Sequence, residues 1–184
     1  MNTLKLTCLL QEIKAVRILQ NAADRVRGQS WQIFLLKMTF ASFAIKMPFF
    51  ILLSILGLGD GPTTTDVAMA QLSTPLVILA VALIWAPIFE TCVFQTLPIE
   101  ILNKLTGGKT AAIIGSAVFF GAAHYPDAQW LGSLLTFAPG LIFAWSYQVW
   151  REKSFMKAVG MTSGIHFMHN LICLGLYQIA QLLK

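Results

Sequence analysis

The sequence predicts an all-α protein: a polytopic transmembrane helix bundle of about five spans, preceded by an N-terminal amphipathic helix at the membrane interface. Composition is the first reason, since hydrophobic residues make up 57% of the 184 residues and charged residues only 11%, whereas about a quarter of a soluble domain is charged. The second reason is that the apolar residues gather in runs of about 20, the length that an α-helix needs to cross a bilayer.

Residues 1–30 are expected to form an amphipathic helical segment that lies on the bilayer surface. Charged residues interrupt the apolar ones every few positions, so the segment has no apolar region of the kind found in secretory signals. A helix that packs on cytosolic parts of the same chain is the alternative. The residues that carry the helical pattern are Leu6, Leu9, Leu10, Ile13 and Val16, and the basic ones available to anionic headgroups are Lys5, Lys14, Arg25 and Arg27.

The remaining residues, 31–184, are expected to form one transmembrane domain, because no linker, repeat or low-complexity tract divides them. Lys37 lies near the start of the first span and can extend to the interface, whereas Lys46 lies near its middle and should face the bundle interior or a wet cavity. The five predicted spans are about 31–58, 74–98, 110–126, 129–149 and 158–182.

Loop charges predict the orientation of the bundle, because Lys and Arg collect on the cytoplasmic side of a membrane. The N-terminal tail is basic, as are the loops after the second and fourth spans, whereas the other two loops are acidic. We therefore expect a multi-pass protein of the plasma or inner membrane with a cytoplasmic N-terminus and a C-terminus outside. This topology explains the net charge of +5 without a nucleic-acid partner. The residues that decide it are Lys104, Lys109, Arg151, Lys153 and Lys157 against Asp60, Asp66 and Asp127.

Polar side chains inside the spans are candidates for function, because an ionisable group in hydrocarbon costs at least a few kcal/mol without partners or water. His166 and Asn170 are four residues apart and share one helical face, with His169 beside them. Glu90 follows Pro87 by three residues, and this proline removes a backbone hydrogen bond and loosens the helix ahead of the carboxylate. The candidates are Lys46, Glu90, Gln95, His124, His166, His169 and Asn170.

A carboxylate, imidazoles and an amide from three spans together indicate a hydrolytic site. Low dielectric disfavours the charged form of a glutamate, which suits Glu90 to take a proton from water. A neighbouring His or Asn can donate to the oxygen that becomes negative when the water adds to a carbonyl. The alternative for each polar residue by itself is a hydrogen bond between helices. The set as a whole predicts peptide-bond hydrolysis inside the membrane.

The order and spacing of these residues resemble the CAAX protease and bacteriocin-processing family of intramembrane proteases, often called Abi proteins. The family pattern is Glu-Glu-x-x-x-Arg, then Phe-x-x-x-His, then His-x-x-x-Asn, on successive transmembrane helices. Phe120 and His124 match the second motif, and His166 and Asn170 match the third. The resemblance covers about residues 80 to 175, nearly all of the last four spans.

The first motif of the family is altered in this chain. Glu90 matches the leading glutamate, but Thr91 stands where the second glutamate would be and Gln95 replaces the arginine. The two changes balance in charge, so we expect a Thr91–Gln95 hydrogen bond in place of a supporting ion pair.

The resemblance implies a role for each matching residue. Glu90 would activate the water with help from His124, while His166 and Asn170 would stabilise the oxyanion. The implied substrate is a peptide or protein at or in the membrane, in contact with lipid, and no cofactor is required. A zinc site of His124, His166 and Glu90 is the alternative on ligand type, although it would use the only obvious base and lacks a His-Glu-x-x-His motif. Residues with supporting roles are Thr91, Gln95, Phe120 and His169.

Two other function classes stay open from the sequence. A non-catalytic scaffold or bacteriocin-immunity-like protein on the same fold is favoured by Thr91 and Gln95. A proton-linked transporter would also use intramembrane Glu and His, but the outer half of the second span has no polar side chain. Depth is a further concern, because Glu90 and His166 should lie roughly 12 Å from the cytoplasmic ends of their spans and His124 roughly 22 Å.

Overall fold

The computed structural model describes residues 28–57 and 74–183 and divides the chain into two units, Met1–Phe34 and Leu35–Lys184. The predicted amphipathic segment falls almost entirely on residues 1–27, and most of the acidic loop falls on 58–73, so both predictions lie outside the described residues. In the first unit the described residues open a helix, in which the Phe34 N–H donates to the Ser30 carbonyl at 3.1 Å. Every regular element of the described residues is helical, which confirms the all-α prediction.

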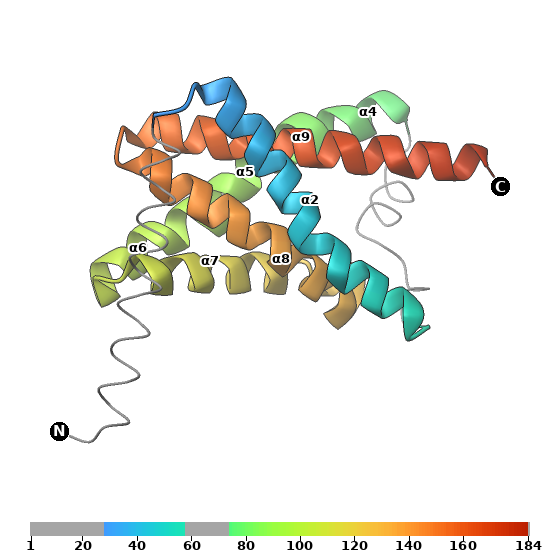
Figure 1. Cartoon of the computed structure of the whole chain (residues 1–184), viewed down its shortest axis with the longest axis horizontal. Coiled ribbons are helices and arrows are strands. Elements are labelled where there is room, and N and C mark those ends of the chain that lie inside the picture. Colours follow the sequence, from blue (N-terminus) through green and yellow to red (C-terminus); the bar gives the residue numbers. More distant parts are fainter. Residues whose placement is uncertain (1–27, 58–73, 184) are drawn as a thin grey trace, which may run out of the picture. The chain divides into compact units, whose positions relative to one another are not determined.

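Five long helical stretches correspond to the five predicted apolar runs (Figure 1). The second stretch is continuous but irregular, because two π-helical segments interrupt it. It also runs on to Thr106, well beyond the predicted end at 98. The elements are α2 (Trp31–Ile55), α4 (Pro75–Ala80), η1 (Val81–Trp85), α5 (Ala86–Glu90), η2 (Thr91–Thr96), α6 (Leu97–Thr106), α7 (Lys109–Ala123), α8 (Tyr125–Arg151) and α9 (Phe155–Leu182).

Short turns join the helices from α6 onwards. Gly107 ends α6 in a left-handed conformation with φ of 63°, which glycine adopts at little cost, and its N–H donates to the Asn103 carbonyl at 3.0 Å. A single residue, His124, separates α7 from α8. The predicted third span, 110–126, was therefore too long by three residues. Pro126 lies in the first turn of α8, where a proline is tolerated because its missing N–H would have no helical partner.

The core of the second unit lies between α7 and the C-terminal half of α8. Phe143, Ala144 and Tyr147 of α8 are almost completely buried, as is Ala117 of α7. The two helices approach most closely at Gly121, where an added Cβ would lie 2.7 Å from the Ser133 carbonyl oxygen. The α8 helix also packs against α9, and α6 packs against α7. This arrangement places α5, α7 and α9 around one common point.

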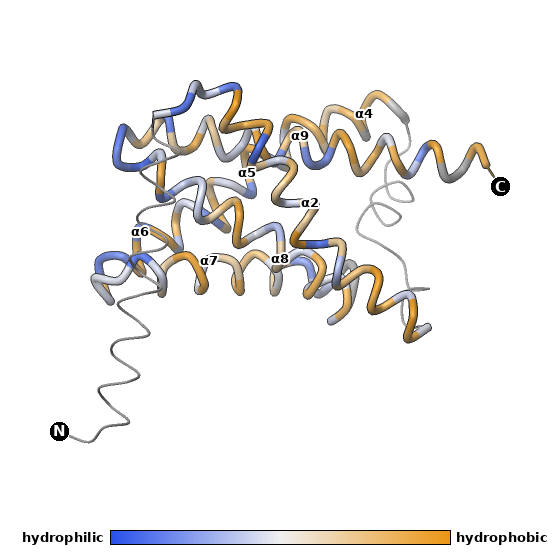
Figure 2. The backbone as a smooth tube through the Cα atoms, in the orientation of Figure 1, coloured by the Kyte–Doolittle hydropathy of each residue, from blue (hydrophilic) through white to orange (hydrophobic). Residues whose placement is uncertain are grey.

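Charged and polar side chains join the ends of α6, α7 and α8. Arg151 Nε donates to Glu100 Oε1 at 2.6 Å, and Tyr147 Oη donates to the same oxygen at 2.9 Å. Lys109 at the start of α7 pairs with Glu152 after α8. Hydrophilic residues consequently gather at the end of the unit where α6 meets α7 and α8 meets α9 (Figure 2).

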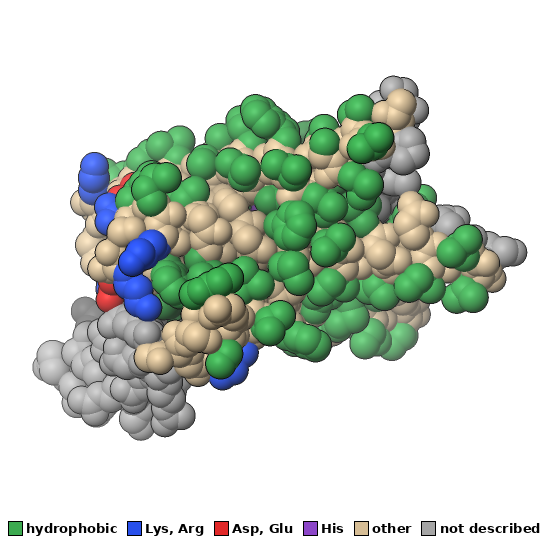
Figure 3. Space-filling view, turned by 90° about the horizontal axis from the view of Figure 1, so that it is seen from above, with side chains coloured by type: hydrophobic (Ala, Val, Ile, Leu, Met, Phe, Trp, Pro, Cys, Tyr) green, Lys and Arg blue, Asp and Glu red, His purple; other side chains and the backbone are tan. Residues whose placement is uncertain are grey.

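The surface away from this end is largely apolar. Figure 3 shows hydrophobic side chains over most of one face, with Lys and Arg at its edge. Two helices of the described residues, Trp31–Ile55 and Val81–Thr106, are long and apolar enough to cross a membrane, and α7 is a shorter apolar helix. Patches of this extent are rare on soluble monomers and indicate contact with lipid or protein. Large hydrophobic side chains that are highly exposed include Phe40, Ile55, Leu76, Leu105 and Met156.

Replacement of Gly121 by alanine should destabilise the protein, because the new Cβ would meet backbone and Cβ atoms of α8 at 2.7 to 3.3 Å. We expect the free energy of unfolding to fall by about 1–3 kcal/mol, the usual cost of overpacking. Gly160→Ala is the matched control, since nothing lies within 4 Å of its added Cβ and alanine favours a helix over glycine by roughly 0.5–1 kcal/mol. Unfolding followed by circular dichroism in detergent should separate the two variants, and equal stabilities would contradict the close α7–α8 packing.

Candidate active site

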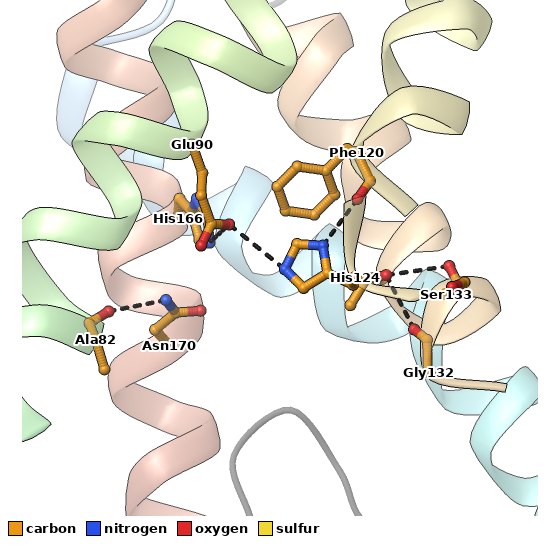
Figure 4. Close-up of polar contacts among 9 residues, drawn as sticks. Ala82, Glu90, Phe120, His124, Gly132, Ser133, His166 and Asn170 are labelled. Carbon is orange, nitrogen blue, oxygen red and sulfur yellow. Dashed lines mark hydrogen bonds and ion pairs between the residues drawn. The ribbon is translucent and has the colours of Figure 1, made fainter. Parts of the chain in front are cut away.

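Three helical stretches bring the predicted carboxylate and two of the histidines together (Figure 4). Glu90 ends α5, His124 lies at the corner between α7 and α8, and His166 lies in α9. Glu90 Oε2 is 3.6 Å from His124 Nε2 and 3.7 Å from His166 Nε2. The side chains of Glu90 and His124 are 19% and 16% exposed, and that of His166 is 5% exposed. The carboxylate and one imidazole are thus accessible, whereas the second imidazole is buried.

The expected mismatch in depth does not occur. Because the helix that carries Glu90 continues to Thr106, Glu90 lies sixteen residues from its end, and His124 lies fifteen residues after Lys109 at the start of α7. The two antiparallel helices therefore place both residues at the same level. The predicted span of 74–98 ended eight residues after Glu90, whereas the helix runs on through Pro98, which occupies the first turn of α6, where proline is compatible with a helix.

The backbone of α7 fixes the orientation of the His124 ring. His124 Nδ1 is 2.8 Å from the carbonyl oxygen of Phe120, one turn earlier. A carbonyl only accepts hydrogen bonds, so Nδ1 carries a proton, and a neutral His124 ring presents the lone pair of Nε2 to Glu90. The Phe120 ring also contacts the His124 ring, with centroids 4.8 Å apart. Phe120, predicted as a supporting residue, thus contacts His124 through both its carbonyl and its ring.

Aromatic packing holds the His166 ring. Phe143 of α8 stacks on it with centroids 4.7 Å apart and planes 26° apart, and the edge of Phe120 approaches at 5.7 Å. Nδ1 of His166 is buried without a hydrogen-bond partner in the described part of the chain. Since Nε2 faces a carboxylate, the proton of the neutral ring is more stable on Nε2. The two imidazoles therefore present opposite groups to Glu90, an acceptor from His124 and a donor from His166.

Asn170 lies one turn beyond His166 but contacts the backbone of another helix. Its Nδ2 donates to the Ala82 carbonyl at 2.9 Å. In η1 the Ala86 N–H donates to the Val81 carbonyl, five residues back. The next donor in this pattern would belong to Pro87, which has no N–H. Asn170 therefore satisfies a carbonyl that the proline leaves without its helical partner.

The predicted Thr91–Gln95 hydrogen bond is wrong. Both side chains are completely buried, but Ser116 Oγ of α7 lies 2.6 Å from Gln95 Oε1 and 3.0 Å from the Phe94 carbonyl. Thr91 Oγ1 has no partner among the described residues. The reason is that Ser116 is directed at the amide oxygen of Gln95, and Pro98, four residues after Phe94, supplies no N–H to that carbonyl.

Another polar residue of the prediction, His169, lies on the side of α9 that faces α2, because its Nδ1 is 2.7 Å from Ser42 Oγ. Lys46 lies on α2 and is half-buried. No sequence signal points to Ser42 or Ser116, because a serine in an apolar helix usually bonds only to its own backbone. Phe143 was missed because it is one of many aromatic residues in the spans.

The three central side chains are also the ligands of the alternative zinc site. Among the described residues no group of three or more His, Cys, Asp and Glu side chains has an arrangement that could hold a metal ion. Catalytic zinc sites need three protein ligands at about 2.0–2.2 Å from one point. The alternative zinc site of His124, His166 and Glu90 therefore stays a prediction, which metal removal would test.

The bond between Asn170 and Ala82 can be tested by restoring the missing N–H. Asn170→Ala should lower the free energy of unfolding by about 1–3 kcal/mol, the cost of a buried carbonyl without a donor. In a Pro87→Ala background the same change should cost clearly less, because residue 87 then has an N–H. Unfolding of the four proteins in mixed micelles gives this double-mutant cycle. An equal cost in both backgrounds would show that the bond does not repair the proline interruption.

Comparison with known proteins gives one match that spans the site. The model of the family described as Type II CAAX prenyl endopeptidase Rce1-like matches residues 72–172. No curated protein and no solved structure matches the chain. The matched region, which is more than half of the chain, contains Glu90, His124, His166 and Asn170 but excludes α2. This protein belongs to the Rce1-like family of type II CAAX prenyl endopeptidases, a membrane-embedded family.

Proposed function

We propose that this protein is an intramembrane endopeptidase that hydrolyses a peptide bond with a water molecule activated by Glu90. The observation that carries the proposal is the approach of one carboxylate oxygen to two imidazole nitrogens, at 3.6 and 3.7 Å, from two other helical stretches. Both distances exceed a hydrogen bond, as is common for catalytic contacts in the absence of substrate. A water beside these three atoms has an acceptor from His124 and a carboxylate base within reach.

In the proposed reaction Glu90 takes a proton from the water as its oxygen attacks the carbonyl carbon of the scissile bond. The lone pair of His124 Nε2 accepts a hydrogen bond from the other O–H of the water. The hydrogen bond from His124 Nδ1 to the Phe120 carbonyl keeps Nε2 directed at the site. When the tetrahedral intermediate collapses, the carbon–nitrogen bond breaks and Glu90 returns its proton to the leaving amine. Glu90 therefore acts as base and then as acid.

The developing negative charge needs hydrogen-bond donors in a dry environment. The Nε2–H of His166 is the first donor, and the ring is nearly completely buried. Asn170 supplies a second N–H, because its amide has two and one already donates to Ala82. Thr91, Gln95 and His169 act indirectly, since their contacts are with the helices that surround the site.

We propose a peptide or protein at or in the membrane as the substrate, and no metal. Membership of a family of prenyl endopeptidases supports the peptide substrate. The extensive apolar surface supports contact with lipid (Figure 3). The proposed mechanism uses the carboxylate of Glu90 as the base and requires no metal ligand.

We propose that all five long helical stretches span the bilayer, with the N-terminus in the cytoplasm and the C-terminus outside. The support is that Lys104, Lys109, Arg151, Lys153 and Lys157 lie in or beside the turns that join α6 to α7 and α8 to α9. Lysine and arginine are enriched on the cytoplasmic side. With this topology the site lies within the membrane, in the interior of the helix bundle.

A non-catalytic scaffold on the same fold is the second candidate. The observation that favours it is the neutral pair at Thr91 and Gln95, where the family motif has a glutamate and an arginine. The scaffold would keep its function without the Glu90 carboxylate, so one substitution distinguishes the two candidates.

Glu90→Gln should abolish peptide cleavage, because glutamine cannot accept a proton from water. We expect kcat to fall by at least about a hundredfold, the range of general-base catalysis. The assay is cleavage of a fluorogenic peptide library presented in detergent or liposomes by purified, monodisperse protein. Glu100→Gln is the matched control, since Glu100 lies on the same helical stretch but bonds to Arg151 and Tyr147, and it should cleave like the wild type.

A metal chelator in the same assay should leave the rate unchanged. Loss of activity with chelator and recovery with zinc would overturn the metal-free mechanism. Full activity of Glu90→Gln would overturn the role of Glu90 as base and favour the scaffold.

The orientation can be tested with single cysteines in a background that lacks Cys8, Cys92 and Cys173. A cysteine at position 183 should react with a membrane-impermeant maleimide on intact expressing cells. A cysteine at position 153 should react only after permeabilisation, because it lies at the basic end. The reverse pattern would place the N-terminus outside and contradict the proposed topology.

A further inference from the structure

The helix outside the family match, α2, makes a buried hydrogen bond to the helix that carries His166. Ser42 Oγ of α2 lies 2.7 Å from His169 Nδ1 of α9. Both residues are buried, with exposed fractions of 0% for Ser42 and 4% for His169. A polar pair that is shielded in this way adds both stability and a fixed geometry.

A second contact of Ser42 determines which atom donates. Ser42 Oγ donates to the carbonyl of Thr39 at 2.6 Å, and a hydroxyl group has one proton. The hydrogen between Ser42 and His169 therefore comes from the ring, so His169 carries its proton on Nδ1. Loss of the Ser42 hydroxyl would leave this buried N–H without an acceptor.

The His169 ring is connected to His166 through one aromatic side chain. The edge of Phe143 meets the His169 ring at 5.8 Å with planes 88° apart, and Phe143 stacks on His166 at 4.7 Å. Phe43 of α2 stacks on the other side of His169 at 4.4 Å. The ring of Phe143 thus contacts both histidines of α9. A change in the tilt of the His169 ring would therefore displace the Phe143 ring.

We propose that Ser42 is a positioning residue of the endopeptidase: it holds the His169 ring, and Phe143 transmits this constraint to His166. The proposal rests on the proposed function. It follows from the state of His166, whose Nδ1 has no hydrogen-bond partner in the described part of the chain. The orientation of His166 Nε2–H toward Glu90 depends on the rings packed against His166. The α2 helix restrains these rings through the bond from His169 to Ser42. The α2 helix is therefore part of the catalytic unit.

The test compares Ser42→Ala with Thr39→Val in the cleavage assay. Thr39 lies one turn earlier on α2, and its buried hydroxyl has no partner among the described residues, so Thr39→Val removes a hydroxyl without removing the bond. We expect Ser42→Ala to lower kcat by about tenfold with KM within about twofold, because His166 acts in the transition state. Thr39→Val should match the wild type. His169→Phe should lower kcat similarly, and adding Ser42→Ala to it should cost nothing more.

Nitrogen-15 NMR of histidine-labelled protein gives a readout that is independent of cleavage. In the wild type His169 should carry its proton on Nδ1, and Ser42→Ala should shift the ring signals of both His169 and His166, whereas Thr39→Val should shift neither. A proton on Nε2 of His169, or an unmoved His166 signal in Ser42→Ala, would overturn the proposal. Ser42→Cys nearly preserves the volume and weakens the acceptor, so it gives the same information should Ser42→Ala not fold. If the wild type cleaves no peptide, the proposed function fails. The NMR signals would still show whether Ser42 affects His166 through His169.

Discussion

The requirement that buried backbone groups find hydrogen-bond partners governs the whole site. The helical stretch that carries Glu90 contains Pro87 and Pro98, and each removes one N–H from its ladder. Water is not available in hydrocarbon to replace the missing donor. Side chains of neighbouring helices contact the stretch near both prolines. Asn170 of α9 donates to the Ala82 carbonyl. Ser116 Oγ of α7 lies 2.6 Å from Gln95 Oε1 and 3.0 Å from the Phe94 carbonyl oxygen. The two contacts lie on either side of Glu90 in the sequence.

These same two helices carry the histidines that face Glu90. Asn170 is one turn beyond His166, and Ser116 is two turns before His124. The contacts of Asn170 and Ser116 with the irregular helix therefore also hold the carboxylate close to both imidazoles. Single-turn π-helical segments frequently occur at functional sites, and here they lie on the helical stretch that carries Glu90.

The two imidazoles show how identical side chains acquire different properties from their surroundings. The Phe120 carbonyl accepts a hydrogen bond from His124 Nδ1, so that a neutral ring directs the lone pair of Nε2 toward Glu90. His166 has no such partner and is held between aromatic rings, so its proton is directed at the carboxylate. The carboxylate of Glu90 thus has two histidine neighbours that direct Nε2 at it but differ in the partner of Nδ1.

The sequence by itself determined the class of fold, because runs of about 20 apolar residues have no stable alternative to a helix in a bilayer. It also determined the chemical candidates, because Glu90, His124, His166 and Asn170 are rare polar residues in those runs. The tertiary structure alone decided their partners. A proline can end a helix or lie within one, so the extension of the Glu90 helix to Thr106, and with it the common level of Glu90 and His124, could not be predicted locally. The contacts of Gln95 with Ser116 and of His169 with Ser42 join residues far apart in the chain, and they depend on the rotation of packed helices, which short-range spacing does not specify.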